Sequence, residues 1–283
     1  MARFLAWADL HNEFWGKLPG IPETCLDVDA LLLGGDINTK GRHLDDALLL
    51  WHELQRPVIL VRGNHEFYKS VMPDLLAEEQ IRLAEMNAAG ADIRILDGGS
   101  TIVGDTRIVG ATLWTDLDLY PGMFRPAREV VQASMNDFSQ IRSKQGKHLS
   151  IDDWLEFHWK DRDAIHNELL KPFDGKTMVM THHIAVRDMI HPLREVGAPE
   201  RYVSNAGFAS DIWWQFSKFD ITAWFSGHSH DNRSAVKRND FGETRFLSNS
   251  RGYPKEGCDF DPSFIIDTHM DHDLEYCGYP EKS

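Results

Sequence analysis

The chain has 283 residues, of which 42% are hydrophobic and 26% charged, so a disordered or fibrous protein is not expected. The formal net charge of -14 disfavours broad binding to nucleic acid or to an anionic membrane, because both need a basic surface. No stretch approaches the roughly 20 apolar residues that cross a bilayer, and Asp9 comes too early for a signal peptide. We therefore expect a cytoplasmic protein without a membrane partner.

The length suits one α/β domain covering residues 1–283. Its three cysteines, Cys25, Cys258 and Cys277, are an odd number without CxxC spacing. This pattern favours free thiols over a disulfide framework or a cysteine-based zinc site.

The first part of the chain predicts a β-α-β unit. An apolar run from Phe4 to Ala8 predicts a strand that ends before Asp9, and Ala30 to Leu33 predicts another that ends before Asp36. Helical periodicity follows from Arg42 to Gln55, and a third strand begins after Pro57. These strands are apolar throughout, as strands buried on both faces are.

The middle of the chain predicts a helix from Asp74 to Ala89, which Gly90 ends. Residues Ile93 to Trp114 alternate apolar and turn residues, which indicates strands joined by a hairpin and hence a mixed sheet. Residues Asp116 to Lys171 break that alternation and have helical spacing. We interpret residues 116–171 as a helical insertion that caps the functional site.

The last part returns to strands. Thr177 to Met180 and Ile221 to Phe225 are predicted strands that precede histidine-rich motifs, and Asp211 to Phe219 is a predicted helix. Apolar runs at 234–236, 244–247 and 264–266 predict antiparallel strands, and the polar tail after Asp271 is expected to be loose.

Five short motifs with Asp, Asn or His directly follow predicted strands. They are Asp9-Leu10-His11, Gly35-Asp36, Gly63-Asn64-His65-Glu66, Thr181-His182-His183 and Gly227-His228-Ser229-His230. In an extended chain positions i and i+2 lie on the same side, so Asp9 with His11, and His228 with His230, are expected to converge.

These side chains suit a pair of metal ions. Asp36 can bridge two cations, Asn64 supplies a neutral oxygen and His182 another imidazole. Such a set fits two divalent ions roughly 3.5–4 Å apart, which would attract phosphate and promote in-line displacement at phosphorus. Imidazole and carboxylate without thiolate suit Mn, Fe or Zn, and we expect Mn first.

The motifs, in this order, resemble the calcineurin-like metallophosphoesterase family, whose pattern is D-x-H, G-D, G-N-H-[DE], H and G-H-x-H. The resemblance implies a four-layer α/β/β/α sandwich around two mixed sheets. It also implies two metal sites bridged by Asp36, with His65 as the general acid that protonates the leaving alkoxide or as a residue that positions the phosphate. The implied ligands are Asp9, His11, Asp36 and His230 for one metal, and Asp36, Asn64, His182 and His228 for the other.

The chain departs from the protein serine/threonine phosphatases, whose block G-D-x-x-D-R-G is absent after Asp36. We therefore expect a phosphodiesterase for a small, nucleotide-like phosphate ester. A phosphomonoesterase or a nuclease of the same family are alternatives, and the acidic composition ranks the nuclease lower. A non-catalytic scaffold with the same fold is the alternative from another class.

Other residues near the motifs receive more ordinary roles. His183 should face away from the ligands and support its neighbour, whereas Glu66 either caps its turn or accepts a hydrogen bond from a neighbouring residue. Arg251 is a candidate for binding a phosphate oxygen.

Two groups of side chains could instead meet a substrate. The basic stretch from Arg142 to Lys147 is expected to be a solvated turn. Trp213, Trp214 and Trp224 could stack on a base, but we expect them to pack in the core.

Overall fold

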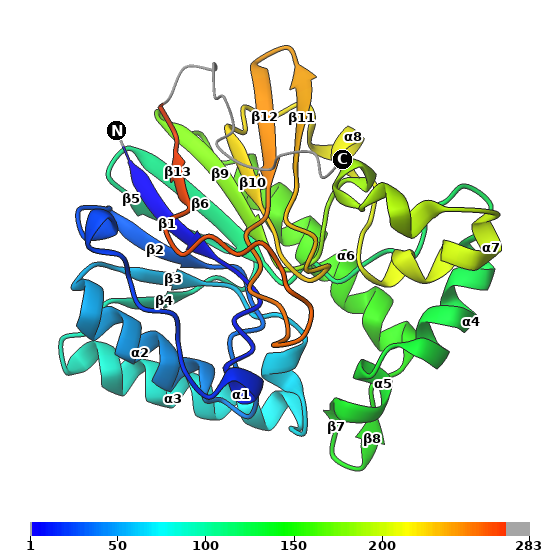
Figure 1. Cartoon of the computed structure of the whole chain (residues 1–283), viewed down its shortest axis with the longest axis horizontal. Helices are drawn as coiled ribbons and strands as arrows, with labels where there is room; N and C mark the ends of the chain where they lie inside the picture. Colours follow the sequence, from blue (N-terminus) through cyan, green and yellow to red (C-terminus); the bar gives the residue numbers. More distant parts are fainter. Residues whose placement is uncertain (1, 270–283) are drawn as a thin grey trace.

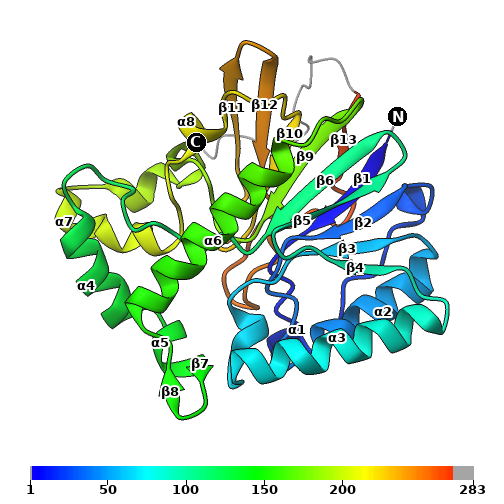
Figure 2. The ribbon, with the colours of Figure 1, turned by 180° about the vertical axis from the view of Figure 1, so that it is seen from behind.

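The computed structural model describes residues 2–269 and contains two β-sheets packed face to face (Figures 1 and 2). The predicted tail after Asp271 and Cys277 lie outside the described residues. The first sheet has the order β13 (Ile265–Asp267), β1 (Arg3–Trp7), β2 (Ala30–Leu33), β3 (Val58–Leu60), β4 (Ile93–Ile95). The second has the order β11 (Ser234–Asn239), β12 (Gly242–Leu247), β10 (Ala223–Phe225), β9 (Lys176–Thr181), β6 (Thr106–Ala111), β5 (Gly99–Val103).

Both sheets are mixed, as the sequence predicts. In the first, β1 to β4 run parallel and β13 pairs antiparallel with β1. In the second, β6, β9, β10 and β12 run parallel, while the edge strands β5 and β11 are antiparallel to their neighbours.

Helices cover the outer faces of the two sheets. Helices α2 (His43–Leu54) and α3 (Met72–Ala88) cover the first sheet, and α6 (Ile151–Leu169) lies along β5 and β6 of the second (Figures 1 and 2). Helix α6 starts at Ser150, whose side chain accepts from the Asp153 N–H while the Asp153 carboxylate accepts from the Ser150 N–H. This capping box satisfies donors that a helix start otherwise leaves unpaired.

Shorter elements complete the fold. The α-helices are α1 (Asn12–Trp15), α4 (Phe124–Ser134), α5 (Asp137–Gln140), α7 (Pro199–Tyr202) and α8 (Trp213–Phe216). The 3₁₀ helices are η1 (Glu23–Cys25), η2 (His65–Phe67), η3 (Arg187–Met189), η4 (Pro192–Glu195) and η5 (Val203–Gly207). A small hairpin pairs β7 (Arg142–Lys144) with β8 (Lys147–His148) and lies beside the sandwich in Figure 1.

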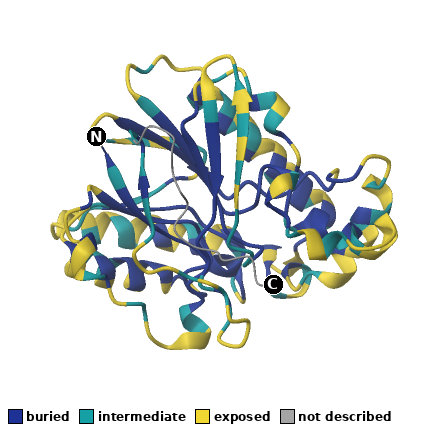
Figure 3. Ribbon diagram, turned by 45° about the horizontal axis from the view of Figure 1, so that its top comes forward, coloured by how far each residue is buried: buried dark blue, intermediate teal, exposed yellow. Residues whose placement is uncertain are grey.

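Three apolar cores separate the four layers. Along β1, Phe4 and Ala6 point between the sheets, whereas Leu5 and Trp7 point toward the helices of the first sheet. In the second sheet, Met178 faces the first sheet and the next residue, Val179, packs in the core that contains α6. Because both faces of each sheet are covered, central strands such as β2 and β6 are buried throughout, whereas the edge strands β5 and β11 alternate between half-buried and exposed residues (Figure 3). The four-layer α/β/β/α prediction is therefore confirmed.

Three details differ from the expectations. The helix expected at 211–219 is only one turn, α8, which buries Phe216, and Ile212 just before it is buried as well. The segment 116–171 contains the hairpin β7–β8 as well as helices, and its basic residues lie around the hairpin turn. Trp224 is buried, but Trp214 is 74% exposed, so the core position expected for Trp214 is wrong.

Among the described residues, no helix is both long and apolar enough to cross a bilayer.

Candidate metal centre

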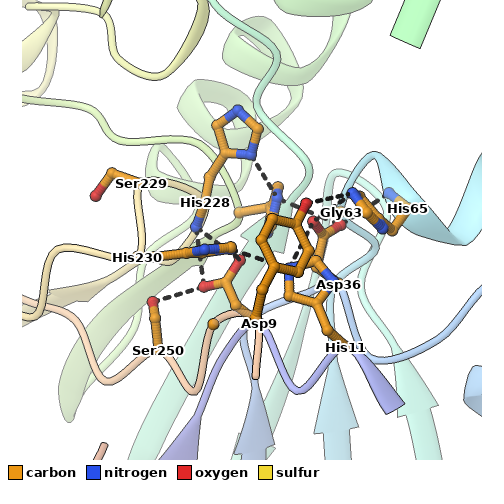
Figure 4. Close-up of polar contacts among 12 residues, drawn as sticks. Asp9, His11, Asp36, Gly63, His65, His228, Ser229, His230 and Ser250 are labelled. Carbon is orange, nitrogen blue, oxygen red and sulfur yellow. Dashed lines mark hydrogen bonds and ion pairs between the residues drawn. The ribbon is translucent and has the colours of Figure 1, made fainter. Parts of the chain in front are cut away.

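The predicted motifs meet at one edge of the sandwich, just beyond the carboxyl ends of parallel strands from both sheets (Figure 4). Asp9 and His11 follow β1, Asp36 follows β2 and Asn64 follows β3, all in the first sheet. His182 follows β9, and His228 and His230 follow β10, in the second sheet. The carboxyl ends of parallel strands share an edge, which is where ligands bind in such sheets.

The backbone of this edge is not extended. Asp9, His11, Asp36, His228 and His230 all have left-handed φ values, between 44° and 72°. The expected reason for their convergence, alternation along an extended chain, is therefore wrong, although the side chains do converge. Left-handed backbone is costly for residues with a Cβ, and clusters of it are typical of functional sites.

Two glycines allow the loops after β2 and β3 to touch. Gly35 has a φ of 90°, and a Cβ built on it would lie 2.6 Å from the Gly63 nitrogen. A Cβ on Gly63 would in turn overlap the Asp36 carboxylate. Only glycine at both positions brings Asp36 next to Asn64.

The ligand candidates form two clusters that share Asp36. The first half-site consists of Asp9, His11 and His230. Its two imidazoles face each other with Nε2 atoms 3.0 Å apart, and the His230 Nε2 lies 3.5 Å from Asp9 Oδ1. The Asp36 Oδ2 is 3.8 Å from the His11 Nε2.

The second half-site consists of Asn64, His182 and His228. The His182 Nε2 lies 3.0 Å from the His228 Nδ1 and 3.1 Å from the Asn64 Oδ1. The Asp36 Oδ1 is 3.4 Å from the same His182 nitrogen. The carboxylate of Asp36 thus turns one oxygen to each half-site, which is the geometry of a bridging ligand.

Each histidine has a partner on its outward ring nitrogen. In the first half-site these are carboxylates, with His11 Nδ1 3.3 Å from Glu13 and His230 Nδ1 2.6 Å from Glu256. In the second they are backbone carbonyls, Gly34 O at 2.9 Å from His182 Nδ1 and Gly207 O at 3.3 Å from His228 Nε2. Acceptors at these positions hold the ring protons outward.

The residues fit two cations. With the ring protons held outward, lone pairs of His11 and His230 face each other, as do those of His182, His228 and the Asn64 oxygen. Such lone pairs repel at this separation, 3.0 Å between ring nitrogens, unless a positive charge lies between them. Nitrogen and oxygen donors in these numbers are those that divalent transition metals accept.

The charges around the half-sites favour a cation as well. Burial opposes protonation of His230, but Asp9 and Glu256 outweigh it and raise the pKa of His230 to about 10. Asp36 likewise outweighs burial and raises the pKa of His182 to about 9. Burial would raise the pKa of Asp36 itself, but His182 and His65 hold it well below its usual value. Each of these shifts stabilises positive charge between the motifs.

His65 also clusters with His11 and Asp36, and its Nε2 lies 3.9 Å from the Asp36 Oδ2. A further cluster, His230 with Glu256 and Cys258, adds no soft ligand. Burial and the charge of Glu256 raise the pKa of Cys258 to about 12, so its sulfur stays protonated. A thiol in this state is a poor metal ligand.

Glu66 has a structural role. Its buried carboxylate accepts from the backbone N–H of Asp36 at 3.0 Å, Ile37 at 2.7 Å and Gly63 at 2.6 Å. It therefore ties the loop after β2 to the loop after β3. Of the two roles left open for Glu66, the structure shows hydrogen bonding to neighbouring residues.

His65 lies beside both half-sites and faces the cavity. Its Nδ1 is 2.7 Å from Glu13 Oε1, its Nε2 is 3.1 Å from the Tyr253 hydroxyl, and its ring stacks on Tyr68. Burial opposes protonation, but Asp36 and Glu13 outweigh it and raise the pKa of His65. A histidine held in this way is suited to donate a proton from Nε2.

A cavity of about 280 Å³ opens onto the two half-sites. Its walls come from the motifs, from residues 134–137 between the end of α4 and the start of α5, and from Tyr68, Arg194, Phe208, Tyr253 and Glu256. Arg194 forms an ion pair with Asp231 at 2.7 Å and donates to the Ser229 carbonyl at 2.7 Å.

Arg251 and His183 lie outside the lining of this cavity. The guanidinium of Arg251 lies 4.1 Å from the Trp15 ring centre and donates to the Lys17 carbonyl, so the structure does not bring it to the site. His183 is buried with its ring 4.1 Å from that of His228, and it also contacts Trp114.

Several site residues were missed by sequence reasoning: Glu13, Tyr68, Asp137, Arg194, Tyr253 and Glu256. Glu13 and Tyr68 lie within four residues of a motif, so inspection of the neighbouring positions could have found them. The other four come from segments outside the motifs, with Asp137 in α5 and Arg194 in η4, and no spacing in the sequence marks them.

Comparisons with known proteins agree with this geometry. The family model described as calcineurin-like phosphoesterase matches residues 2–232. A crystal structure of a phosphopantetheinyl hydrolase from Mycobacterium tuberculosis has a similar fold, with a TM-score of 0.63 over 89% of this chain and 90% of that chain, at 18% identity. No curated protein gives a significant sequence match.

Proposed function

Since the chain belongs to the calcineurin-like phosphoesterase family and is a metal-dependent phosphoric ester hydrolase, we propose that it is a phosphodiesterase for a small, nucleotide-like substrate. The observation that carries the metal assignment is the pair of half-sites joined by Asp36, each with donor atoms within 4.8 Å of one another. The family uses a dimetal centre. The pairing of Arg194, the one Arg or Lys among the described residues that line the cavity, with Asp231 supports the diester.

We assign each half-site one metal ion. Asp9, His11, Asp36 and His230 would hold the first, and Asp36, Asn64, His182 and His228 the second. Two divalent cations here would lower the pKa of a water molecule and neutralise charge on the phosphoryl oxygens. We propose Mn, with Fe or Zn as alternatives, because the donors are nitrogen and oxygen only.

The chain's own residues would handle the leaving group. Glu13 accepts from His65 Nδ1 and fixes the ring so that Nε2 points into the cavity, where Tyr253 lies 3.1 Å away. His65 would give the Nε2 proton to the departing alkoxide, which makes it the general acid. Burial of His65 and Glu13 keeps bulk water from competing for this proton.

The cavity favours a diester over a monoester. Arg194 is the only Arg or Lys among the described residues that line it, and Asp231 already neutralises part of its charge. The lining also includes the carboxylates of Asp137 and Glu256. A monoester carries about two negative charges near neutral pH and a diester one, so the diester meets less repulsion in such a cavity.

Metal analysis and hydrolysis together test this proposal. We expect about two metal ions per chain, Mn²⁺-dependent hydrolysis of bis(p-nitrophenyl) phosphate and slower hydrolysis of p-nitrophenyl phosphate. Faster monoester hydrolysis would favour a phosphatase instead. Two metals with neither activity would point to a restricted substrate, for which nucleotide diesters and phosphopantetheine esters are the first to be screened. Fewer than two metals after Mn²⁺ loading would contradict the dimetal assignment.

The remaining expectations are still predictions: a cytoplasmic location, the absence of a nucleic-acid partner, and a capping role for residues 116–171.

A further inference from the structure

The amide of Asn64 is held in one orientation by a residue outside the motifs. Its Nδ2 donates to the hydroxyl of Tyr68 at 3.2 Å. This leaves Oδ1 on the other side, 3.1 Å from the His182 Nε2 in the second half-site. The orientation matters because only the amide oxygen, not the NH₂ group, can bind a metal ion.

The Tyr68 hydroxyl can accept from Asn64 because its own proton goes elsewhere. It donates to Asp137 Oδ2 at 3.2 Å. An ionised carboxylate only accepts hydrogen bonds. Asp137 therefore sets the direction in which Asn64 donates to Tyr68 and Tyr68 donates to Asp137. Without Asp137, Tyr68 could donate to Asn64 instead, which would favour the flipped amide with NH₂ toward the half-site.

Asp137 occupies an unusual position for a carboxylate. It lies at the start of α5 in the segment 116–171, is fully buried and lines the cavity. Its Oδ1 has no hydrogen-bond partner among the described residues. Burying a carboxylate with so few donors costs free energy, so packing alone does not account for an Asp here.

The backbone holds this arrangement in place. The Lys69 N–H donates to the Gln140 carbonyl at 2.8 Å, and the Arg142 N–H donates to the Ser70 carbonyl at 3.2 Å. The end of α5 is thus tied to the two residues that follow Tyr68. The Tyr68 ring also stacks on His65, with centres 4.1 Å apart and planes 24° apart.

We propose that Asp137 is a positioning residue that, through Tyr68, fixes the Asn64 amide with its oxygen toward the second metal ion. This inference rests on the proposed function, because it takes Asn64 as a ligand of that metal. It makes the occupancy of one half-site depend on the segment 116–171. Among the described residues, no hydrogen bond joins Asp9, His11 or His230 of the first half-site to Asn64, Tyr68 or Asp137.

The test is a Mn²⁺ titration of the purified protein, which measures binding without turnover. Tyr68→Phe removes the hydroxyl, and Asp137→Leu removes the acceptor at similar volume. We expect each to weaken one of two Mn²⁺ ions by about 10–100-fold, the range typical when a group that orients a ligand is lost, and to leave the other unchanged. Ser139→Ala, an exposed position on the same helix, is the control and should bind as the wild type does.

The double variant Tyr68→Phe with Asp137→Leu separates positioning from general destabilisation. Because both residues act through one chain of hydrogen bonds, it should bind Mn²⁺ no more weakly than Tyr68→Phe alone. Additive losses, equal losses at both half-sites, or wild-type binding by Tyr68→Phe would overturn the inference. If Asp137→Leu does not fold, Tyr68→Phe and Asp137→Asn still test the positioning role of Asp137. The Asp137→Asn variant retains an acceptor oxygen at this position, so it should lose less affinity than Tyr68→Phe.

A wild-type protein that binds fewer than two Mn²⁺ ions would instead contradict the proposed function itself. The wild-type titration therefore distinguishes the failure of the dimetal assignment from the failure of the role of Asp137.

Discussion

The two half-sites share Asp36 but are supported differently. In the first, the outward nitrogens of His11 and His230 face the carboxylates of Glu13 and Glu256. In the second, those of His182 and His228 face backbone carbonyls, and both rings are fully buried or nearly so. A carboxylate behind an imidazole raises its basicity more than a carbonyl does. The first half-site should therefore hold its metal more tightly. Because its supporting groups are side chains, a substitution can remove them, whereas the backbone carbonyls of the second half-site cannot be removed in this way.

The pKa values of the histidines differ within each half-site rather than between the two. Asp9 and Glu256 outweigh burial and raise the pKa of His230 to about 10. Burial and the neighbouring His183 and His182 lower the pKa of His228 well below its usual value. In the same way, burial lowers the pKa of His11 in the first half-site, while Asp36 outweighs burial and raises the pKa of His182 in the second to about 9. The half-sites therefore differ in their supporting groups, and the second depends in particular on the orientation of Asn64.

The largest effect on metal binding is expected from Asp36→Asn, which should weaken both half-sites and so remove the difference between them. Asp36 turns one oxygen to each half-site, so its loss should weaken both metals by more than the roughly 10–100-fold seen when a supporting group is lost. Elemental analysis after dialysis would measure this. Retention of one metal at wild-type affinity would show that Asp36 does not bridge.

His65→Ala should separate chemistry from metal binding. Because His65 is not among the proposed ligands and its Nε2 lies 3.1 Å from the Tyr253 hydroxyl, both metals should remain while turnover of a diester with a poor leaving group falls by about 10²–10⁴-fold. A substrate with a p-nitrophenol leaving group needs less protonation and should lose less. Loss of metal from this variant would mean that His65 is a ligand rather than an acid.

Glu256→Ala should affect the first half-site alone. Removing the carboxylate 2.6 Å from His230 Nδ1 should weaken one metal by about 10–100-fold and leave the other in place. Lys255→Ala, at the adjacent exposed position, controls for disturbance of the loop. Equal weakening of both metals in a Mn²⁺ titration would argue against the difference between the half-sites.

The smallest effect concerns a buried acid outside both half-sites. Asp161, in α6, accepts from the Leu113 N–H, and burial raises its pKa to about 7. Because the folded-state pKa is raised, the wild type should lose stability as pH rises from about 4 to 7.

Asp161→Asn keeps an acceptor without the charge. It should therefore leave stability nearly unchanged at pH 4 and raise it by about 1–4 kcal/mol at pH 8. Denaturant unfolding at both pH values measures this. A change in stability that is the same at pH 4 and pH 8 would show that folding does not raise the pKa of Asp161.

The features that could be predicted from the sequence, namely the strands and the edge where the motifs meet, are those that follow from regular secondary structure. Apolar runs identified the strands, and the residues after them reached one edge because parallel strands end together. The way in which these side chains converge could not be predicted, because Asp9 and His228 adopt a left-handed backbone conformation. The alternation of side chains along an extended strand does not include this conformation.

Residues that depend on tertiary contacts could not be predicted. Glu256 reaches His230 from a loop that carries no motif, and Asp137 reaches Tyr68 from a short helix whose position depends on packing. Arg251 follows a strand near the site but turns to Trp15, and a distant residue, Arg194, lines the cavity instead. Sequence position alone does not specify where such side chains point.

The most direct test of the account is a crystal structure of the Mn²⁺-loaded protein with anomalous scattering measured at the manganese edge. We expect two peaks, one among Asp9, His11 and His230 and one among Asn64, His182 and His228, with Asp36 between them. A single peak, or a second peak away from these residues, would contradict the dimetal centre.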